Sequence, residues 1–206
     1  MLYKLTDGFS DAFSMFMLMD FKQDQRPVIV TNKVNEVEMY KELYLKYFFS
    51  TNVDKVKIKR EPNEFFDEVI TAYHNPVFQN LDLFLNNVKD KTMFNKKEHY
   101  CYSLASNRKS YKGMDDEMME YIKPLLVNGT DLGNSRNFES FEQMEQKFLT
   151  LCSSKFFIGS EVSWSIFCSF FKIPCMHLFQ FVPYMSTKRV EMNDLTFSVD
   201  PHMVIG

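Results

Sequence analysis

The feature that most constrains the fold is the alternation of short apolar runs with segments of helical periodicity along the chain. Residues 27–31, with the sequence Pro-Val-Ile-Val-Thr, form a continuous apolar run that is typical of a strand buried on both faces. Apolar positions in the next segment recur at helical spacing and predict a helix over residues 35–48. The other predicted strands are residues 2–5, 53–60, 100–104, 125–127, 156–158 and 173–181. The other predicted helices are residues 9–22, 64–73, 78–88, 115–121, 160–171 and one that a capping box opens at Ser140.

Strands that alternate with helices imply parallel strand pairing, because parallel neighbours need a crossover connection. The sequence therefore predicts an α/β fold. A polar and charged stretch at residues 89–98 interrupts the alternation, which restarts after it. We therefore expect two small Rossmann-like domains, residues 1–92 and 93–206, whose parallel sheets face a cleft. Ligands of such sheets bind beyond the carboxyl ends of the strands. That rule selects three loops, which are residues 7–11, 106–112 and 159–163.

Composition and charge exclude several classes of function. The net charge of −3 gives no global basic field that would draw the chain to nucleic acid or to a membrane surface. Charged residues occur too early in the chain for a secretory signal, and no apolar run reaches the roughly 18 residues of a membrane span. We therefore expect a cytoplasmic protein that makes no membrane contact.

The spacing of cysteine and histidine gives no indication of a metal site. The four cysteines lack CxxC spacing and are expected to be buried free thiols rather than disulfides or metal ligands: Cys101, Cys152, Cys168 and Cys175. The histidines are scattered, with no HxH or HExxH pattern. An acidic cluster at residues 115–117 opens a predicted helix, where the helix dipole favours acidic side chains. No metal ion is expected.

The segment with the most specific chemistry joins a predicted strand to a predicted helix at Gly159. Glycine permits a tight turn and close backbone approach, and Ser160 is expected to cap the helix. The amides of the first helical turn then attract phosphate, and the hydroxyls of Ser163 and Ser165 add donors. The same residues also form an ordinary turn and helix cap, so the local pattern leaves both interpretations open. Trp164 is expected either to stack on a base or sugar or to pack in the core.

Residues 157–179 resemble the strand–loop–helix–strand segment of GT-B glycosyltransferases similar to bacterial heptosyltransferases. Gly159-Ser160-Glu161 matches the opening of that motif, and Ile173-Pro174 matches its close without a gap. In the family, the acidic residue and the neighbouring backbone amides bind the nucleotide sugar. The resemblance therefore implies that Glu161 accepts hydrogen bonds from sugar or ribose hydroxyls.

The same segment also departs from the family pattern at three positions. Ser163 replaces a glycine, Ile166 replaces a histidine, and Lys172 replaces a second glycine. These changes leave the implied fold intact, but they leave the contacts to the donor open.

The loop after the first predicted strand carries a weaker resemblance. Gly8-Phe9-Ser10-Asp11 is similar to the G-x-G-D loop of the same enzymes, with Ser10 in place of the second glycine. The resemblance implies that Asp11 is the base that takes the proton of the acceptor hydroxyl, with Asp7 as its substitute. The alternative interpretation is that Asp7 and Asp11 simply favour the N-terminus of a helix.

Residues 103–113 resemble the family loop that contacts the donor phosphates. Cationic side chains are needed there because the leaving nucleoside diphosphate gains negative charge in the transition state. The candidates are Arg108, Lys109 and Lys112. A solvated basic loop is the alternative interpretation.

The implied function is that of an inverting, metal-independent glycosyltransferase that moves a sugar from a UDP-type nucleotide sugar to a hydroxyl acceptor. No cofactor beyond this co-substrate is expected. The compact size and the bias toward Phe, Lys, Asn and Met resemble those of T-even-type phage genes. Such phages use GT-B enzymes to glycosylate hydroxymethylcytosine in DNA, which implies double-stranded DNA as a partner. Three local basic clusters are the expected contacts, at residues 55–60, 89–97 and 108–112. The alternative function is a non-catalytic nucleotide or nucleotide-sugar binding protein, such as a decoy, in which Ser163 and Ile166 mark a retired active site.

Overall fold

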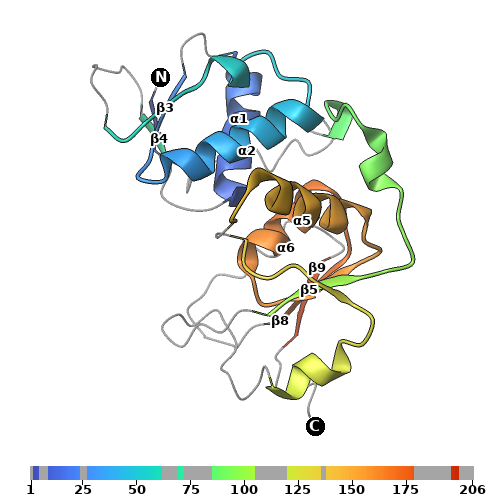
Figure 1. The fold of residues 1–206 in the computed structure, drawn as a ribbon. Coiled ribbons are helices and arrows are strands. Elements are labelled where there is room, and N and C mark those ends of the chain that lie inside the picture. Colours follow the sequence, from blue (N-terminus) through green and yellow to red (C-terminus); the bar gives the residue numbers. More distant parts are fainter. Residues whose placement is uncertain are drawn as a thin grey trace. The chain divides into compact units, whose positions relative to one another are not determined.

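Two parallel β-sheets with helices packed against them form the framework of the protein (Figure 1). The computed structural model describes residues 2–4, 9–23, 27–61, 69–71, 85–104, 120–135, 138–178 and 196–199. The chain divides into two compact units, Met1–Lys91 (unit 1) and Thr92–Gly206 (unit 2). All strand pairs of the two sheets are parallel, so the α/β class and the parallel pairing predicted from the sequence are confirmed.

The sheet of unit 1 has the strand order β3-β2-β1-β4. The described elements of this unit are β1 (Leu2–Lys4), α1 (Phe9–Lys22), β2 (Val28–Val30), α2 (Val34–Tyr47), the 3₁₀ helix η1 (Val53–Lys55), β3 (Lys57–Lys59) and β4 (Val69–Thr71). Because the strand order reverses beside β1, the switch point of this sheet lies between β1 and β4. The edge strand β3 carries Lys57 and Lys59, and lysines on an edge discourage further strand pairing.

Aromatic side chains from α1 and α2 form the core of unit 1. Residues 9–19 of α1 are all buried except Asp11, which is partly buried, because the helix is apolar on almost every side. The ring of Phe13 lies edge-on to Tyr44 at 5.4 Å and to Phe48 at 5.9 Å. Such pairs contribute about 0.5–1.5 kcal/mol each beyond the burial of their surface. The aromatic spacing that predicted α2 is therefore the spacing of its buried face.

The carboxylate of Asp20, in the last turn of α1, fixes the loop that follows α2. Its Oδ1 accepts hydrogen bonds from Ser50 Oγ at 2.7 Å and from the amides of Thr51 and Asn52 at 3.1 Å each. Its Oδ2 accepts a hydrogen bond from the hydroxyl of Tyr44 at 3.1 Å. Burial, and then the neighbouring Asp20 carboxylate, raises the pKa of Tyr44 well above its usual value. Asp20 therefore joins α1, α2 and the loop before η1.

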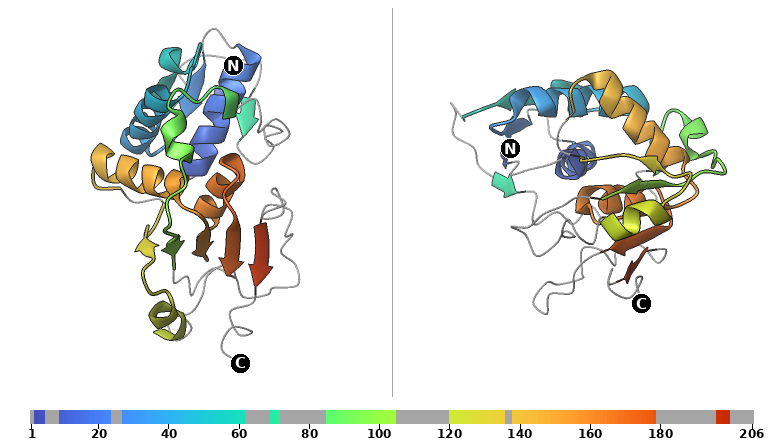
Figure 2. Two further views of the ribbon diagram at one scale, coloured as in Figure 1. Left: turned by 90° about the vertical axis from the view of Figure 1, so that its right-hand side faces the viewer. Right: turned by 60° about the horizontal axis from the view of Figure 1, so that its bottom comes forward.

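The sheet of unit 2 has the strand order β6-β5-β7-β8-β9, and its strands lie side by side in Figure 2. The elements described here are η4 (Lys91–Phe94) at the start of the unit, β5 (Cys101–Ser103), η5 (Lys123–Leu125), β6 (Thr130–Asp131), α5 (Phe141–Ser153), β7 (Phe157–Gly159), α6 (Val162–Phe170), β8 (Cys175–Leu178) and β9 (Thr196–Val199). Numbered within the unit, the order is 2-1-3-4-5, one of the common doubly wound orders. The strand order reverses between β5 and β7, which makes that position the switch point.

Helices α5 and α6 pack on one face of this sheet. Cys101, Phe157 and Cys175 are register partners in one row of that face, and all three are fully buried. The C-cap residue of α5, Ser154, donates a hydrogen bond to Cys101 Sγ at 3.0 Å. All four cysteines are free and buried, as predicted. Burial raises the pKa of the Cys101 thiol to about 12.

Three predicted elements are wrong. Residues 69–71 form β4 and not part of a helix over 64–73, because their β-branched side chains suit the strand that pairs with β1. Residues 125–127 belong to η5 and a turn rather than to a strand, and β6 begins only after Asn128-Gly129. Residues 53–55 form η1, so the strand predicted over 53–60 shortens to β3.

Several other boundaries were predicted closely. Strands β1, β2, β5, β7 and β8 and helices α1, α2, α5 and α6 lie within two residues of their predicted starts. Ser140 caps α5, as predicted, by accepting a hydrogen bond from the Gln143 amide at 3.3 Å. Strand β9 was not predicted. Of the predicted helices over 78–88 and 115–121, only the last few residues lie within the described ranges. No described helix is both long and apolar enough to span a membrane.

Candidate functional site

The switch point of unit 2 brings the ends of β5 and β7 together. Ser103 and Gly159 are register partners at the carboxyl ends of these strands, and the Ser160 amide donates to the Ser103 carbonyl at 3.1 Å. In doubly wound sheets, ligands bind in the crevice outside the carboxyl ends at this point. The predicted loop 159–163 therefore begins at the position where the topology favours a ligand.

Gly159 is required by the packing of the sheet itself. A Cβ at this position would lie 2.5 Å from the carbonyl oxygen of Ser103 and 2.7 Å from the ring of Phe157. These distances are shorter than any ordinary contact, so any larger residue would force β5 and β7 apart. The close backbone approach at Gly159 was predicted for a ligand, but it is made by the Ser103 carbonyl at the end of β5.

Glu161 caps α6, so the prediction that Ser160 caps it is wrong. Glu161 Oε2 accepts a hydrogen bond from the Trp164 amide at 3.3 Å, and its side chain is only 8% exposed. A carboxylate is favoured at a helix N-terminus because it meets the positive end of the dipole. Its negative charge therefore occupies a place where the sequence predicted phosphate. Ser160 and Ser163 are both buried beside it.

The carbonyl of Gly133 links the two sides of the switch point, and no sequence pattern predicted this role. It accepts hydrogen bonds from Ser103 Oγ at 2.7 Å and from Trp164 Nε1 at 2.9 Å. The backbone of Gly133 has a φ of +61°, which favours glycine. Its amide donates to Asp131 Oδ1 at 2.8 Å. The loop after β6 therefore touches both the end of β5 and the first turn of α6.

Trp164 packs in the core, which is one of the two roles expected for it. Its side chain is fully buried, with the ring of Phe138 edge-on at 6.3 Å and the ring of Phe167 at 6.1 Å. Because its indole N–H bonds to the Gly133 carbonyl, the ring also holds the loop in place. Trp164 is thus a buried support of the Gly133 loop.

Lys147 supplies a positive charge beside this loop, and the sequence prediction missed it. Its Nζ lies 5.8 Å from the centroid of the Phe138 ring and 3.4 Å from the position of a Cβ on Gly133. Lys147 comes from the middle of α5, on a helix whose other face was predicted to be the core. Only the tertiary structure brings it to the loop. The buried Oγ of Ser135, in the same loop, has no hydrogen-bond partner.

The other predicted site residues are not brought together by the described structure. Asp11 lies in the first turn of α1 in unit 1 and is partly buried. Asp7, Arg108, Lys109 and Lys112 lie outside the described residues. The first basic cluster, residues 55–60, spans the end of η1 and the edge strand β3.

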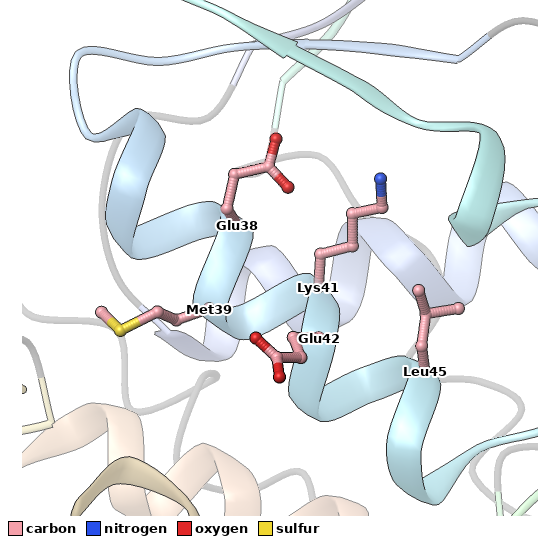
Figure 3. A pocket seen from close by; sticks show the side chains of 5 residues that line it. All are labelled: Glu38, Met39, Lys41, Glu42 and Leu45. Carbon is pink, nitrogen blue, oxygen red and sulfur yellow. The ribbon is translucent and has the colours of Figure 1, made fainter. Parts of the chain in front are cut away.

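A surface hollow of about 320 Å³ lies on α2 in unit 1 (Figure 3). Its lining residues are Glu38, Met39, Lys41, Glu42 and Leu45. The ammonium of Lys41 donates a hydrogen bond to the Val56 carbonyl at 3.0 Å, so this cation has a structural role within unit 1. A hollow lined by one helix and two carboxylates lacks converging polar groups, so the switch point of unit 2 remains the better candidate site.

Within the described ranges, no group of three or more histidine, cysteine, aspartate or glutamate side chains is arranged to hold a metal ion. Comparisons with family models, curated proteins and solved structures gave no match.

Proposed function

We propose that the chain is an inverting glycosyltransferase that binds a UDP-type nucleotide sugar at the switch point of unit 2. The observation that carries the proposal is that a sequence motif and the switch point of the sheet fall at the same position. The Gly159-Ser160-Glu161 segment, which resembles a nucleotide-sugar motif, begins where the strand order of an all-parallel sheet reverses. The motif and the strand order thus point to the same position, and this agreement supports a nucleotide-type ligand there.

In this proposal, each predicted residue keeps a distinct task. Glu161, held by the Trp164 amide, meets sugar or ribose hydroxyls, because a carboxylate repels phosphate. Arg108, Lys109 and Lys112 bind the donor phosphates and stabilise the charge of the leaving diphosphate. Asp11 takes the proton of the acceptor hydroxyl. We further propose that units 1 and 2 are the acceptor and donor halves of a GT-B enzyme, with hydroxymethylcytosine in DNA as the acceptor.

Donor binding is tested by calorimetry of the full chain with UDP, GDP, ADP and their common sugar conjugates. We expect UDP and one UDP-sugar to bind more tightly than the other nucleotides. A chain that binds none of them at millimolar concentration is not a nucleotide-sugar enzyme. Lys109→Ala and Lys112→Ala should each weaken UDP binding by about 1.5–3 kcal/mol if they contact the phosphates.

Catalysis is tested with Asp11→Asn, since asparagine keeps the shape of the side chain but cannot accept the proton. Turnover should fall by roughly 10²–10⁴-fold, with donor affinity unchanged. The measurement is transfer of labelled sugar to hydroxymethylated DNA at saturating donor. Asp54→Asn, a change of an exposed aspartate in the same unit, is the matched control. Normal turnover in Asp11→Asn would remove Asp11 from the mechanism and make Asp7 the next candidate.

A second candidate function is nucleotide-sugar binding without catalysis. The observation that favours it is the burial of Ile166, 7% exposed, at the position of the family histidine. An apolar side chain packed there cannot bind phosphate or transfer a proton. A chain that binds a UDP-sugar tightly, yet neither hydrolyses it nor transfers its sugar to any acceptor tested, has this function.

A further inference from the structure

The ammonium of Lys147 is held beside the Gly133 loop without a carboxylate partner. Among the described residues its one interaction is with the face of Phe138, 5.8 Å from the ring centroid. A cation over the face of an aromatic ring is attracted to it, and this attraction biases the position of the ammonium. Phe138 is itself placed by its edge-on contact with Trp164. The charge of Lys147 is thus directed toward a loop and not toward an ion pair.

Ser135 gives a second, independent sign of a ligand at the same loop. Its side chain is fully buried, and its Oγ has no hydrogen-bond partner. A buried hydroxyl without a partner lowers stability, so most buried polar groups are paired. Ser135 follows Gly133 by two residues, and the Gly133 carbonyl is tied to Ser103 and Trp164 at the switch point. An acceptor oxygen from a ligand would satisfy this hydroxyl.

Two carboxylates also lie at this edge, and both are occupied by backbone amides. Asp131 accepts from the Gly133 amide at 2.8 Å, and Glu161 accepts from the Trp164 amide at 3.3 Å. Neither forms an ion pair with Lys147. Lys147 therefore forms no ion pair among the described residues, and an incoming phosphate meets its ammonium at the loop that also carries Asp131.

We propose that Lys147 and Ser135 bind a phosphate group of the nucleotide at the carboxyl edge of the unit 2 sheet. Lys147 provides the charge, and the Ser135 hydroxyl donates a hydrogen bond to a phosphate oxygen. This inference rests on the proposed function for the nature of the nucleotide. This inference differs from the sequence prediction in the position of the phosphate, because Glu161 caps the start of α6, where phosphate was predicted.

The test measures binding of inorganic pyrophosphate, UDP and uridine to the full chain by calorimetry at constant ionic strength. Lys147→Met keeps the length of the side chain and removes its charge, so it should weaken pyrophosphate and UDP alike by about tenfold or more. Lys147→Arg should restore most of the affinity. Lys155→Met is the matched control, because Lys155 lies before β7 in the same unit, pairs with Glu98 at 2.9 Å and is 59% exposed. It should leave both affinities unchanged.

Ser135→Ala separates a ligand role from a structural one. Removing a buried hydroxyl that has no partner should leave the Tm unchanged or raise it, while pyrophosphate binding weakens. A lower Tm together with unchanged pyrophosphate binding would show that the hydroxyl serves the fold, and would overturn its assignment.

The outcomes distinguish this inference from the proposed function. Equal UDP affinity in the wild type and Lys147→Met overturns the phosphate site and leaves the nucleotide function standing. Pyrophosphate binding that depends on Lys147, with no added affinity for any nucleotide, supports the phosphate site and contradicts the nucleotide function. Absence of binding by both pyrophosphate and UDP overturns both.

Discussion

Replacing Asp20 tests the account of how unit 1 is held together. Asp20→Ala removes the acceptor for four hydrogen bonds, two from hydroxyls and two from backbone amides. The amide of Thr51 is exposed and regains water, so its loss costs little. The hydroxyl of Tyr44, a residue only 2% exposed, is left without this acceptor. An orphaned buried hydroxyl costs about 1–3 kcal/mol, and the remaining bonds to the carboxylate add to that.

The expected loss for Asp20→Ala is therefore about 3–5 kcal/mol, a large part of the stability of a small domain. Asp20→Asn should cost only about 1 kcal/mol. Its amide oxygen still accepts the three bonds now made to Oδ1, and its NH₂ group can donate to the Tyr44 oxygen. Hydrogen-bond chemistry therefore predicts a larger loss of stability for Asp20→Ala than for Asp20→Asn. A nonspecific effect of changing residue 20 would not produce this difference.

The assay is urea unfolding followed by two signals. Trp164 is the single tryptophan of the chain and lies in unit 2, so its fluorescence reports that unit. Far-UV circular dichroism reports the helices of both units. We expect Asp20→Ala to lower the midpoint of the dichroism transition, with Asp54→Ala as the control on an exposed aspartate of the same unit. A loss below about 1 kcal/mol, or equal losses for Ala and Asn, would refute the assigned role.

Two further predictions concern unit 2. Gly159→Ala places a Cβ 2.5 Å from the Ser103 carbonyl, so it should destabilise the unit by about 1–3 kcal/mol or more, seen as a lower urea midpoint in Trp164 fluorescence. Gly133→Ala is the comparison variant. Its Cβ would meet only Lys147 Nζ, at 3.4 Å, so it adds little steric clash, but the φ of +61° at this position adds backbone strain. Cys101 keeps its proton in the folded chain to about pH 12, against an ordinary value of 9.0. The unfolded chain therefore binds fewer protons above pH 9, and stability should fall as the pH rises from 9 toward 12, by at most about 1.4 kcal/mol per pH unit from this thiol. Cys101→Ala should flatten that pH dependence, and an unchanged slope would contradict the assignment.

The elements that sequence predicted well are those whose local pattern agrees with their tertiary surroundings. The run at residues 27–31 is apolar because β2 is buried in the middle of a sheet, and α1 is apolar on all sides because it is buried along most of its length. The errors occur where tertiary pairing decides. Residues 69–71 form a strand because β1 offers an edge to pair with, and no local periodicity records that edge.

The strand end at which the candidate site is proposed was predictable from the sequence, but the contacts of its residues were not. The glycine and acidic residue after β7 mark the end of a buried strand, and the alternation of strands and helices selects the carboxyl ends. The roles of these residues depend on what lies across from them. The absence of a side chain at Gly159 leaves room for the Ser103 carbonyl. Glu161 accepts the hydrogen bond of the Trp164 amide, which was predicted to bind phosphate. Neither neighbour can be identified from spacing along the chain.

The occupied start of α6 has a consequence for any anionic ligand of unit 2. A phosphate at that position would lie against the buried Glu161 carboxylate, and two like charges repel more strongly away from bulk water. The favourable place is therefore displaced from the helix start toward a cation. Lys147 lies there, beside Gly133, because α5 crosses to β7 after the loop that follows β6. Glu161 and Lys147 thus come from successive connections of one sheet, and the hydrogen bond from Trp164 Nε1 to the Gly133 carbonyl joins those two connections.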